Sequence, residues 1–348
     1  MSASTTTHDT PRKPRLRPFR ILSLAGGGFL GLYTAKVLAE LEALDGTPLG
    51  RRFDLLAGTS VGGILALALA FEIPMAEVVR LFLDRGREIF SARGMPGTRV
   101  GRLLDLSRQV MGPKYSGRAL FKALAQQLGE RTLGEALHPV VIPAVDVSRS
   151  RTKVFKTPHA PASRGDEAVR AMDVAMATSA APAYFPSVRI GEHLYADGGL
   201  FAVAPDQVAL HEAEHFMGIR PRQVRMLSLG TATRDYRPET PVEADDGAVG
   251  WLDGGRLLLT LVSVQQQHVE AMMEDRLGRR YLRLDASWPQ GRGLGIDIAT
   301  PEAVEVLTGL AERTLAELPL ETLRKRFRIG AGRPSRTDRA AAPASQST

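Results

Sequence analysis

One serine of this sequence stands in a setting typical of a hydrolytic nucleophile. Ser60 is the centre of the pentapeptide 58–62, G-T-S-V-G, which fits the pattern G-x-S-x-G. The apolar run 53–57 before it predicts a buried strand, and the apolar run 63–70 after it predicts a buried helix. This arrangement is a nucleophile elbow, in which the backbone turns sharply and the serine hydroxyl projects at the top of a sheet. The N-terminus of the following helix favours negative charge beside that hydroxyl.

A structural interpretation of the same motif stays open. Gly58 and Gly62 would also suit an ordinary strand-to-helix turn, in which the Ser60 side chain only caps the helix. Chance alone supplies about 0.2 matches to this pattern in a chain of this composition. The functional interpretation therefore depends on the other motifs.

A run of glycines follows the first predicted strand, 19–25. Gly26, Gly27 and Gly28 present bare backbone N–H groups at the start of a helix, an arrangement that makes an oxyanion hole. With Gly31 they also satisfy G-x-G-x-x-G, the pattern of a dinucleotide-binding turn. That alternative requires an acidic residue at the end of the next strand, whereas Asp54 lies at its start. We favour the oxyanion hole, because parallel strands would bring both glycine turns to one edge of the sheet.

A serine nucleophile needs a base, and Asp197 is the candidate. It ends a short β-like run and is followed by Gly198 and Gly199, although Asp-Gly is also common in plain turns. A conventional triad would instead use a histidine after the acid, and the candidates are His211, His215 and His268. None stands in a setting typical of a catalytic base. The sequence therefore favours a Ser60–Asp197 dyad, with a Ser-His-Asp esterase as the alternative.

No metal or cofactor is indicated by the sequence. His211 and His215 have the spacing of two zinc ligands on a helix, but a third ligand is not evident and neighbouring glutamates suit a solvated face. The chain has no cysteine, which excludes disulfides and thiolate metal sites.

The composition indicates an ordinary globular protein, and most of its net positive charge lies at the two ends of the sequence. Of the 348 residues, 44% are hydrophobic and 24% charged, and the net charge is +7. Residues 1–20 contribute +4 and residues 331–348 contribute +2, so the remainder is nearly neutral. This distribution argues against a specific nucleic-acid surface, while the basic ends suit either weak attraction to anionic lipid or simple solubility. No apolar run approaches transmembrane length, and we expect a cytoplasmic protein.

Apolar strands alternate with helices along the chain, which predicts an α/β fold with a mainly parallel central sheet flanked by helices. The predicted strands are 19–25, 53–58, 140–147, 153–157, 193–196, 224–230 and 281–285. The predicted helices are 29–45, 61–72, 75–90, 116–128, 166–178, 205–217, 253–275, 301–317 and 319–328.

The same pattern predicts one domain with two disordered ends. We expect a basic tail at 1–18, a single domain at 19–330 and a second tail at 331–348. The glycine-rich stretch 91–115 is the candidate for a mobile loop or cap, and 234–250 for a second loop. The leucine-rich helix 253–275 would line a substrate cleft or a membrane-facing surface, although core packing explains it more simply.

The three motifs, in this order, resemble those of the patatin-like phospholipases, and residues 19–210 carry the resemblance. It implies a patatin-like acyl hydrolase domain with Ser60 as nucleophile, Asp197 as base, and Gly26, Gly27 and Gly28 as oxyanion donors. The implied activity is hydrolysis of acyl esters in membrane glycerophospholipids through an acyl-enzyme. Two departures matter.

The first departure is Leu30, where members commonly carry arginine or lysine before the last glycine of the first motif. This change puts a phosphate contact at that place in doubt. The second is Ala204-Pro205, where many members have Asn-Pro, and it affects loop geometry rather than chemistry.

Within the family, the stretches 20–41 and 141–157 are similar to bacterial phospholipase effectors of antiphage signalling. This resemblance implies a cyclic dinucleotide activator and degradation of the cell's own membrane, with peripheral association at the inner membrane. The sequence contains no pattern for the nucleotide pocket and leaves a homo-oligomer open. A nucleotide-binding oxidoreductase and a non-catalytic sensor or lipid-binding protein remain the rival classes.

Overall fold

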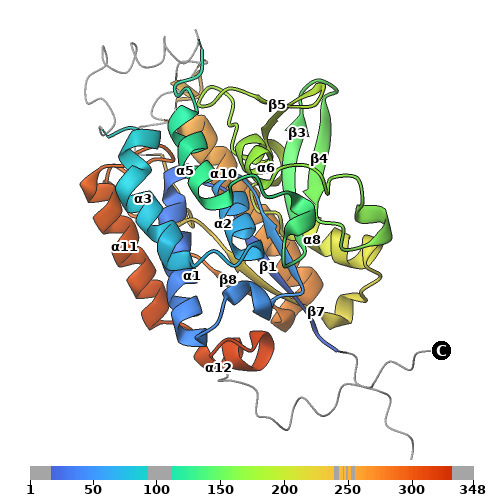
Figure 1. The fold of residues 1–348 in the computed structure, drawn as a ribbon. Coiled ribbons are helices and arrows are strands. Elements are labelled where there is room, and N and C mark those ends of the chain that lie inside the picture. The colour runs from blue at the N-terminus through green and yellow to red at the C-terminus, as the bar shows by residue number, and fades with distance from the viewer. Residues whose placement is uncertain are drawn as a thin grey trace, which may run out of the picture.

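Continuous apolar runs of the sequence become the central strands of one eight-stranded sheet (Figure 1). The computed structural model describes residues 17–92, 112–238, 243–245, 247, 250–251 and 255–330. The strands are β1 (Phe19–Leu24), β2 (Leu55–Gly58), β3 (Val140–Asp146), β4 (Arg151–Lys156), β5 (Val188–Ile190), β6 (His193–Asp197), β7 (Val224–Leu229) and β8 (Tyr281–Leu284). They lie in the order β5-β6-β3-β2-β1-β7-β8, and β4 pairs with β3.

Five of these strands, β3, β2, β1, β7 and β8, run parallel to one another. Every residue of β1 and β2 is buried, as expected for strands that are covered on both faces. The antiparallel strands β4, β5 and β6 extend the sheet beyond β3. The predicted α/β fold with a mainly parallel sheet is confirmed.

Helices cover both faces of the sheet (Figure 1). They are α1 (Gly31–Asp45), α2 (Val61–Ala70), α3 (Met75–Ile89), α5 (Arg118–Leu128), α6 (Ala171–Thr178), α7 (Gly199–Ala202), α8 (Asp206–His211), α10 (Arg256–Leu277), α11 (Pro301–Ala316) and α12 (Leu320–Thr322). The larger buried cluster joins α1, α2, α3, α5, α6 and α11 to one face. On the other face, α8 and the C-terminal half of α10 pack over β1, β2 and β7.

Several predicted boundaries are wrong. No sequence pattern predicts β5, which has only three residues, or the single-turn helix α7. The helix expected at 166–178 begins at Ala171, because residues 166–170 form a turn held by the bond from the Val169 N–H to the Asp166 carbonyl. The helix expected at 205–217 is α8 followed by a π-helical turn at Glu212–Phe216, and 319–328 likewise ends in a π-helical turn.

Some predictions fall on residues that the structure does not describe. Residues 93–111 of the expected loop 91–115, most of both expected tails, and part of the loop 234–250 lie outside the described residues. Among the described residues, no helix is both long enough and apolar enough to cross a membrane.

Candidate active site

Ser60 sits in a strained turn between β2 and α2. Its backbone angles are φ 55° and ψ −128°, which a residue with a side chain rarely adopts. A Cβ atom on Gly58 would lie 2.0 Å from the Gly62 carbonyl oxygen, so only glycine permits this close approach. Ser60 holds the N-cap position of α2, but its hydroxyl makes no capping hydrogen bond. The structural interpretation of this serine as a helix cap is therefore wrong.

Neighbouring elements fix the backbone of this elbow. The Ser60 N–H donates to Thr178 Oγ1 at 3.0 Å, and that hydroxyl donates to the Pro143 carbonyl at 2.7 Å. On the other side, Thr59 Oγ1 donates to the Ala202 carbonyl at 2.7 Å. The end of α6, the strand β3 and the helix α7 thus hold the strained turn in place.

Strand β3 brings the ends of β2 and β6 together. Ala57 of β2 pairs with Val141, whereas Asp197 of β6 pairs with Ala144. Because β4 pairs with β3 from Val141 onward along the opposite edge, β2 and β6 share one edge and run toward each other. Only three residues of β3, about 10 Å, separate the two pairings. The C-terminal end of β2, which leads into Ser60, and the C-terminal end of β6, which carries Asp197, therefore lie next to each other.

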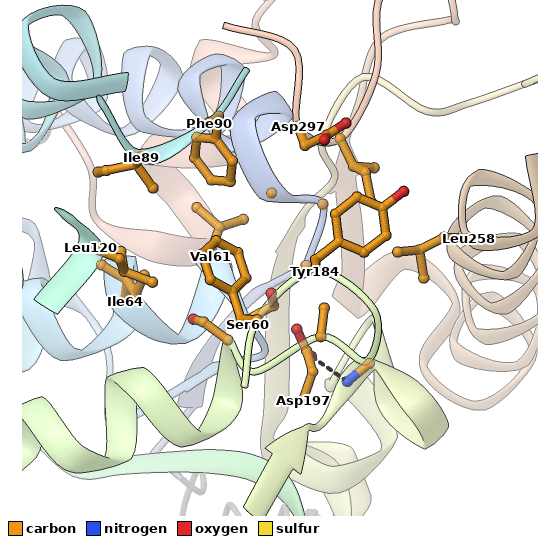
Figure 2. Close-up of a pocket in the computed structure, with 18 of the residues that line it drawn as sticks. Ser60, Val61, Ile64, Ile89, Phe90, Leu120, Tyr184, Asp197, Leu258 and Asp297 are labelled. Atoms are coloured by element: carbon orange, nitrogen blue, oxygen red, sulfur yellow. Dashed lines mark hydrogen bonds between the residues drawn. The ribbon is translucent and has the colours of Figure 1, made fainter. Parts of the chain in front are cut away.

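The Asp197 carboxylate is buried beside Ser60 (Figure 2). Its Oδ1 accepts a hydrogen bond from the Gly199 N–H at 2.7 Å. Burial raises the pKa of Asp197 to about 6, against the opposing effects of the Gly199 N–H and of hydrogen bonding to the Ser60 side chain. A carboxylate with this pKa is ionised at neutral pH yet is a stronger base than an exposed aspartate.

The glycine turn after β1 lies against the elbow. A Cβ atom on Gly26 would be 3.1 Å from Ser60 Cβ, and Gly31 begins α1 in contact with Val61. The Gly26 N–H is already engaged, since it donates to the Val203 carbonyl at 2.9 Å. Within the described part of the chain, no acceptor takes the N–H of Gly27 or Gly28. These two amides therefore remain available as hydrogen-bond donors.

An apolar cavity opens above Ser60 and Asp197 (Figure 2). Its empty volume, including the open mouth, is about 1130 Å³. Side chains of α2, α3, α5 and α10 contribute to its wall, among them Ile64, Ile89 and Leu120. None of the described residues that line it is lysine, arginine or histidine. Such a cavity suits a long hydrocarbon chain whose reacting ester lies at the polar floor.

Sequence comparison agrees with this geometry. Residues 22–210, more than half of the chain, match the family model described as patatin-like phospholipase. The chain belongs to this family. As a patatin-like phospholipase, it is a hydrolase that acts on lipid esters.

Individual relatives are similar over most of their length. A cGAMP-activated phospholipase of Pseudomonas aeruginosa is 40% identical over 270 residues, which cover 77% of this chain and 78% of the relative. One of Vibrio cholerae is 34% identical over 321 residues, covering 84% and 88%. The crystal structure of VipD from Legionella pneumophila is similar with a TM-score of 0.42 and 12% identity, over 87% of this chain and 67% of VipD.

In this patatin-like phospholipase, α10 contributes to the cavity and also holds the polypeptide that follows Asp197. Leu258, Leu261 and Val262 line the cavity, so the simpler expectation of core packing alone is wrong for this helix. Gln265 Oε1 accepts from the Val203 N–H at 3.1 Å, and its Nε2 donates to the Gly199 carbonyl at 3.0 Å. One side-chain amide thus binds both ends of the segment that contains α7.

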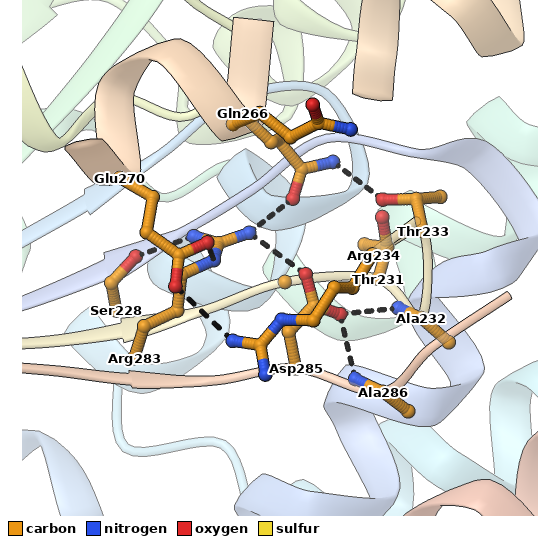
Figure 3. Close-up of polar contacts among 12 residues, drawn as sticks. Ser228, Thr231, Ala232, Thr233, Arg234, Gln266, Glu270, Arg283, Asp285 and Ala286 are labelled. Atoms are coloured by element: carbon orange, nitrogen blue, oxygen red, sulfur yellow. Dashed lines mark hydrogen bonds and ion pairs between the residues drawn. The ribbon is translucent and has the colours of Figure 1, made fainter. Parts of the chain in front are cut away.

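A buried polar network anchors α10 to β8 (Figure 3). The Arg283 side chain, 2% exposed, pairs with Asp285 at 2.9 Å and with Glu270 of α10 at 3.3 Å. Arg283 also donates to Ser228 Oγ at 2.9 Å and to Gln266 of α10. Opposite charges compensate the buried guanidinium and the buried Asp285 carboxylate, while Arg283 Nε faces Glu270 without a hydrogen bond among the described residues. The helix that carries Gln265 is therefore fixed to the sheet.

The candidate histidines lie away from the cavity. His211 and His215 are exposed and stack on each other, with ring centroids 5.0 Å apart. His268 is exposed on α10. The expected solvated face is wrong for Glu212, which is buried and accepts hydrogen bonds from His159 and Ser163. No histidine is placed to serve Ser60 among the described residues that line the cavity.

Sequence reasoning missed the polar residues that position this site. Thr178 and Ser179 interrupt the apolar sequence at the end of α6, and Pro182 follows shortly. Two adjacent hydroxyl residues at the end of a buried helix are the sequence signal that could have pointed to a role of this segment in the site. Nothing in the sequence around Gln265 distinguishes it from its neighbours Gln266 and Gln267.

Proposed function

We propose that this protein cleaves acyl esters of membrane glycerophospholipids through a Ser60–Asp197 dyad. The observation that carries the proposal is the meeting of a strained serine and a buried carboxylate at the floor of an apolar cavity. The raised pKa of Asp197, about 6, suits a general base at neutral pH. The family membership supports the same chemistry.

In the first half of the reaction, Ser60 Oγ attacks the ester carbonyl carbon while Asp197 takes the hydroxyl proton. The oxyanion of the tetrahedral intermediate accepts hydrogen bonds from the N–H groups of Gly27 and Gly28. The intermediate collapses as the bond to the leaving glycerol oxygen breaks. That oxygen keeps the electron pair and receives the proton from Asp197, which leaves an acyl-enzyme on Ser60.

In the second half, Asp197 takes a proton from water as the water oxygen attacks the acyl carbonyl. The bond to Ser60 Oγ breaks, the proton returns to Ser60, and the fatty acid leaves. One carboxylate serves both halves, since the residue that acts as base in one step acts as acid in the next.

The cavity favours recognition of the acyl chain over the head group. Leu30 is fully buried, so the place where relatives carry a cation offers none here. The lining residues that the structure describes include no lysine or arginine to bind a phosphate. We therefore propose that specificity comes from the hydrocarbon chain and that the head group stays outside the cavity.

We propose further that a cyclic dinucleotide activates the enzyme at the cytoplasmic face of the inner membrane, in antiphage defence. The relatives from Pseudomonas aeruginosa, Vibrio cholerae and Escherichia coli are named cGAMP-activated phospholipases, at 33–40% identity over most of this chain. This similarity supports the same kind of switch in this protein.

The test measures fatty acid release from phosphatidylethanolamine–phosphatidylglycerol vesicles, with and without cGAMP. Wild-type protein should release fatty acid and label with a fluorophosphonate probe, whereas Ser60→Ala should lose about 10³-fold or more in rate and all labelling. Equal activity of Ser60→Ala would overturn the dyad. A His211→Ala or His268→Ala variant that lost activity while Asp197→Asn kept it would support a Ser-His-Asp enzyme instead.

A further inference from the structure

Ser179 has a buried hydroxyl with no partner. The residue is 7% exposed, and its Oγ has no hydrogen-bond partner within the described parts of the chain. Leaving a buried hydroxyl unpaired costs free energy, so such a group in a native protein requires an explanation. Ser179 is one of the residues that line the cavity containing Ser60 and Asp197.

The neighbours of Ser179 attach it to both members of the dyad. On one side, Thr178 Oγ1 accepts the N–H of Ser60 at 3.0 Å. On the other side, the Ala180 carbonyl accepts the N–H of Asp197 at 3.0 Å. Ser179 is therefore held between nucleophile and base by the hydroxyl of Thr178 and the carbonyl of Ala180, while its own side chain makes no hydrogen bond within the described residues.

Ser179 lies on the opposite side of Ser60 from the glycine turn. Gly27 and Gly28 follow β1, which neighbours β2 on one side. The segment of Ser179 packs over β3 and β6, which continue the sheet beyond β2 in the other direction. The glycine turn and the segment of Ser179 thus flank Ser60 from two sides. The oxygen on the side of Ser179 and Asp197 is the leaving oxygen, because Asp197 must deliver its proton there.

We propose that the Ser179 hydroxyl donates a hydrogen bond to the leaving glycerol oxygen and is a further catalytic residue of the reaction. As the ester C–O bond breaks, the electron pair moves onto that oxygen, which then takes the proton held by Asp197. Ser179 stabilises the developing negative charge and keeps its own proton. In the second half, the same hydroxyl binds the attacking water, which occupies the place of the departed alcohol.

This inference rests on the proposed dyad, and its test separates the two. Two esters with the same acyl chain are compared, a p-nitrophenyl ester, whose phenolate leaves without assistance, and a monoacylglycerol, whose alkoxide needs it. Ser179→Ala should lower kcat/KM for the monoacylglycerol by about 10-fold or more and for the p-nitrophenyl ester by less than about 2-fold. Ser179→Cys, which fills the space but donates weakly, should show the same selectivity.

A second readout distinguishes this role from a structural one. Because the hydroxyl has no partner to lose, Ser179→Ala should raise the melting temperature by about 1–3 °C while it lowers activity. Ser163→Ala is the matched control, since Ser163 is also buried but donates to Glu212 at 2.7 Å and is not among the described residues that line the cavity. That variant should lower the melting temperature and leave the ratio of the two esters unchanged.

Equal losses on both esters, or no loss on either, would overturn the role of Ser179. In those cases the dyad stands if Ser60→Ala is inactive on both esters. If Ser60→Ala remains active, the proposed function itself fails. A lower melting temperature for Ser179→Ala would also contradict the inference, because it would reveal a contact that the hydroxyl makes within the folded protein.

Discussion

Gln265 joins the polypeptide around Asp197 to the glycine turn through Val203. Its Oε1 accepts the N–H of Val203 at 3.1 Å, and the carbonyl of Val203 accepts the N–H of Gly26 at 2.9 Å. Its Nε2 holds the Gly199 carbonyl at 3.0 Å. The peptide that carries the proposed oxyanion donors and the peptide that follows the proposed base are therefore tied to one helix, α10.

Replacement of Gln265 should lower turnover without loss of substrate binding. In Gln265→Ala both bonds are absent, so the segment after Asp197 and the Gly26 peptide are less well positioned for the transition state. We expect kcat to fall by about 10-fold with KM changed less than about 2-fold. The control is Gln267→Ala, whose amide donates to Ser263 Oγ at 2.9 Å on the same helix and should leave kcat unchanged. An unchanged kcat in Gln265→Ala would mean that the segment after Asp197 keeps its position without the two bonds to Gln265.

The pH dependence of the reaction should follow Asp197. Burial raises its pKa to about 6, and only the ionised form accepts the Ser60 proton. Below this pH, kcat/KM should fall about tenfold per pH unit, and above it a plateau is expected. The measurement is kcat/KM for an uncharged short-chain ester between pH 4.5 and 8, a substrate that has no group titrating in this range. A rise centred near the ordinary pKa of an exposed aspartate would contradict the burial of this carboxylate.

The same raised pKa means that ionisation of Asp197 lowers the free energy of unfolding. The folded protein binds this proton more tightly than the unfolded chain does, so stability falls as pH rises from 3.8, the ordinary value, through about 6. At neutral pH the ionised group costs up to about 3 kcal/mol. Asp197→Asn should therefore unfold at higher denaturant concentration than wild type at pH 7.5, and the difference should vanish near pH 4. Lower stability of the variant at pH 7.5 would show that the carboxylate is better solvated than its burial indicates.

The motif residues could be predicted from the sequence, whereas the residues that position them could not. Ser60 and Asp197 stand in short patterns whose glycines are required by local geometry, such as the 2.0 Å approach at Gly58. Thr178 and Gln265 act through contacts with residues 118 and 62 positions away, and no local pattern records such a contact. The parallel strands were visible because they are continuous apolar runs, while β5 is only three half-exposed residues long.

Relief of backbone strain at the elbow should stabilise the protein. Ser60 holds φ 55° and ψ −128°, which costs about 1–3 kcal/mol for any residue with a Cβ atom. Ser60→Ala keeps that atom and the strain, whereas Ser60→Gly removes both. We expect Ser60→Gly to be more stable than Ser60→Ala by about 1 kcal/mol, after the greater flexibility of glycine in the unfolded chain is subtracted. Denaturant unfolding of the two inactive variants measures the difference, and equal stability would mean that the turn is relaxed.

Removal of Arg283 should destabilise the fold and reduce activity together. Its side chain is 2% exposed and compensates the buried carboxylate of Asp285, which its loss would leave without a cationic partner, whereas Glu270 is 22% exposed and keeps its ion pair with Arg234 at 3.1 Å. Arg283→Met should lower the free energy of unfolding by about 3–5 kcal/mol. Arg283→Lys keeps the charge but not the planar set of donors, so an intermediate loss is expected.

Because Glu270 and Gln266 belong to α10, the helix that holds Gln265 would lose its attachment to β8, and ester hydrolysis should fall even at temperatures where the variant stays folded. Unfolding by urea and hydrolysis assayed at 15 °C test the two effects separately. Full activity in a folded Arg283→Met protein would show that the network stabilises the sheet without positioning the active site.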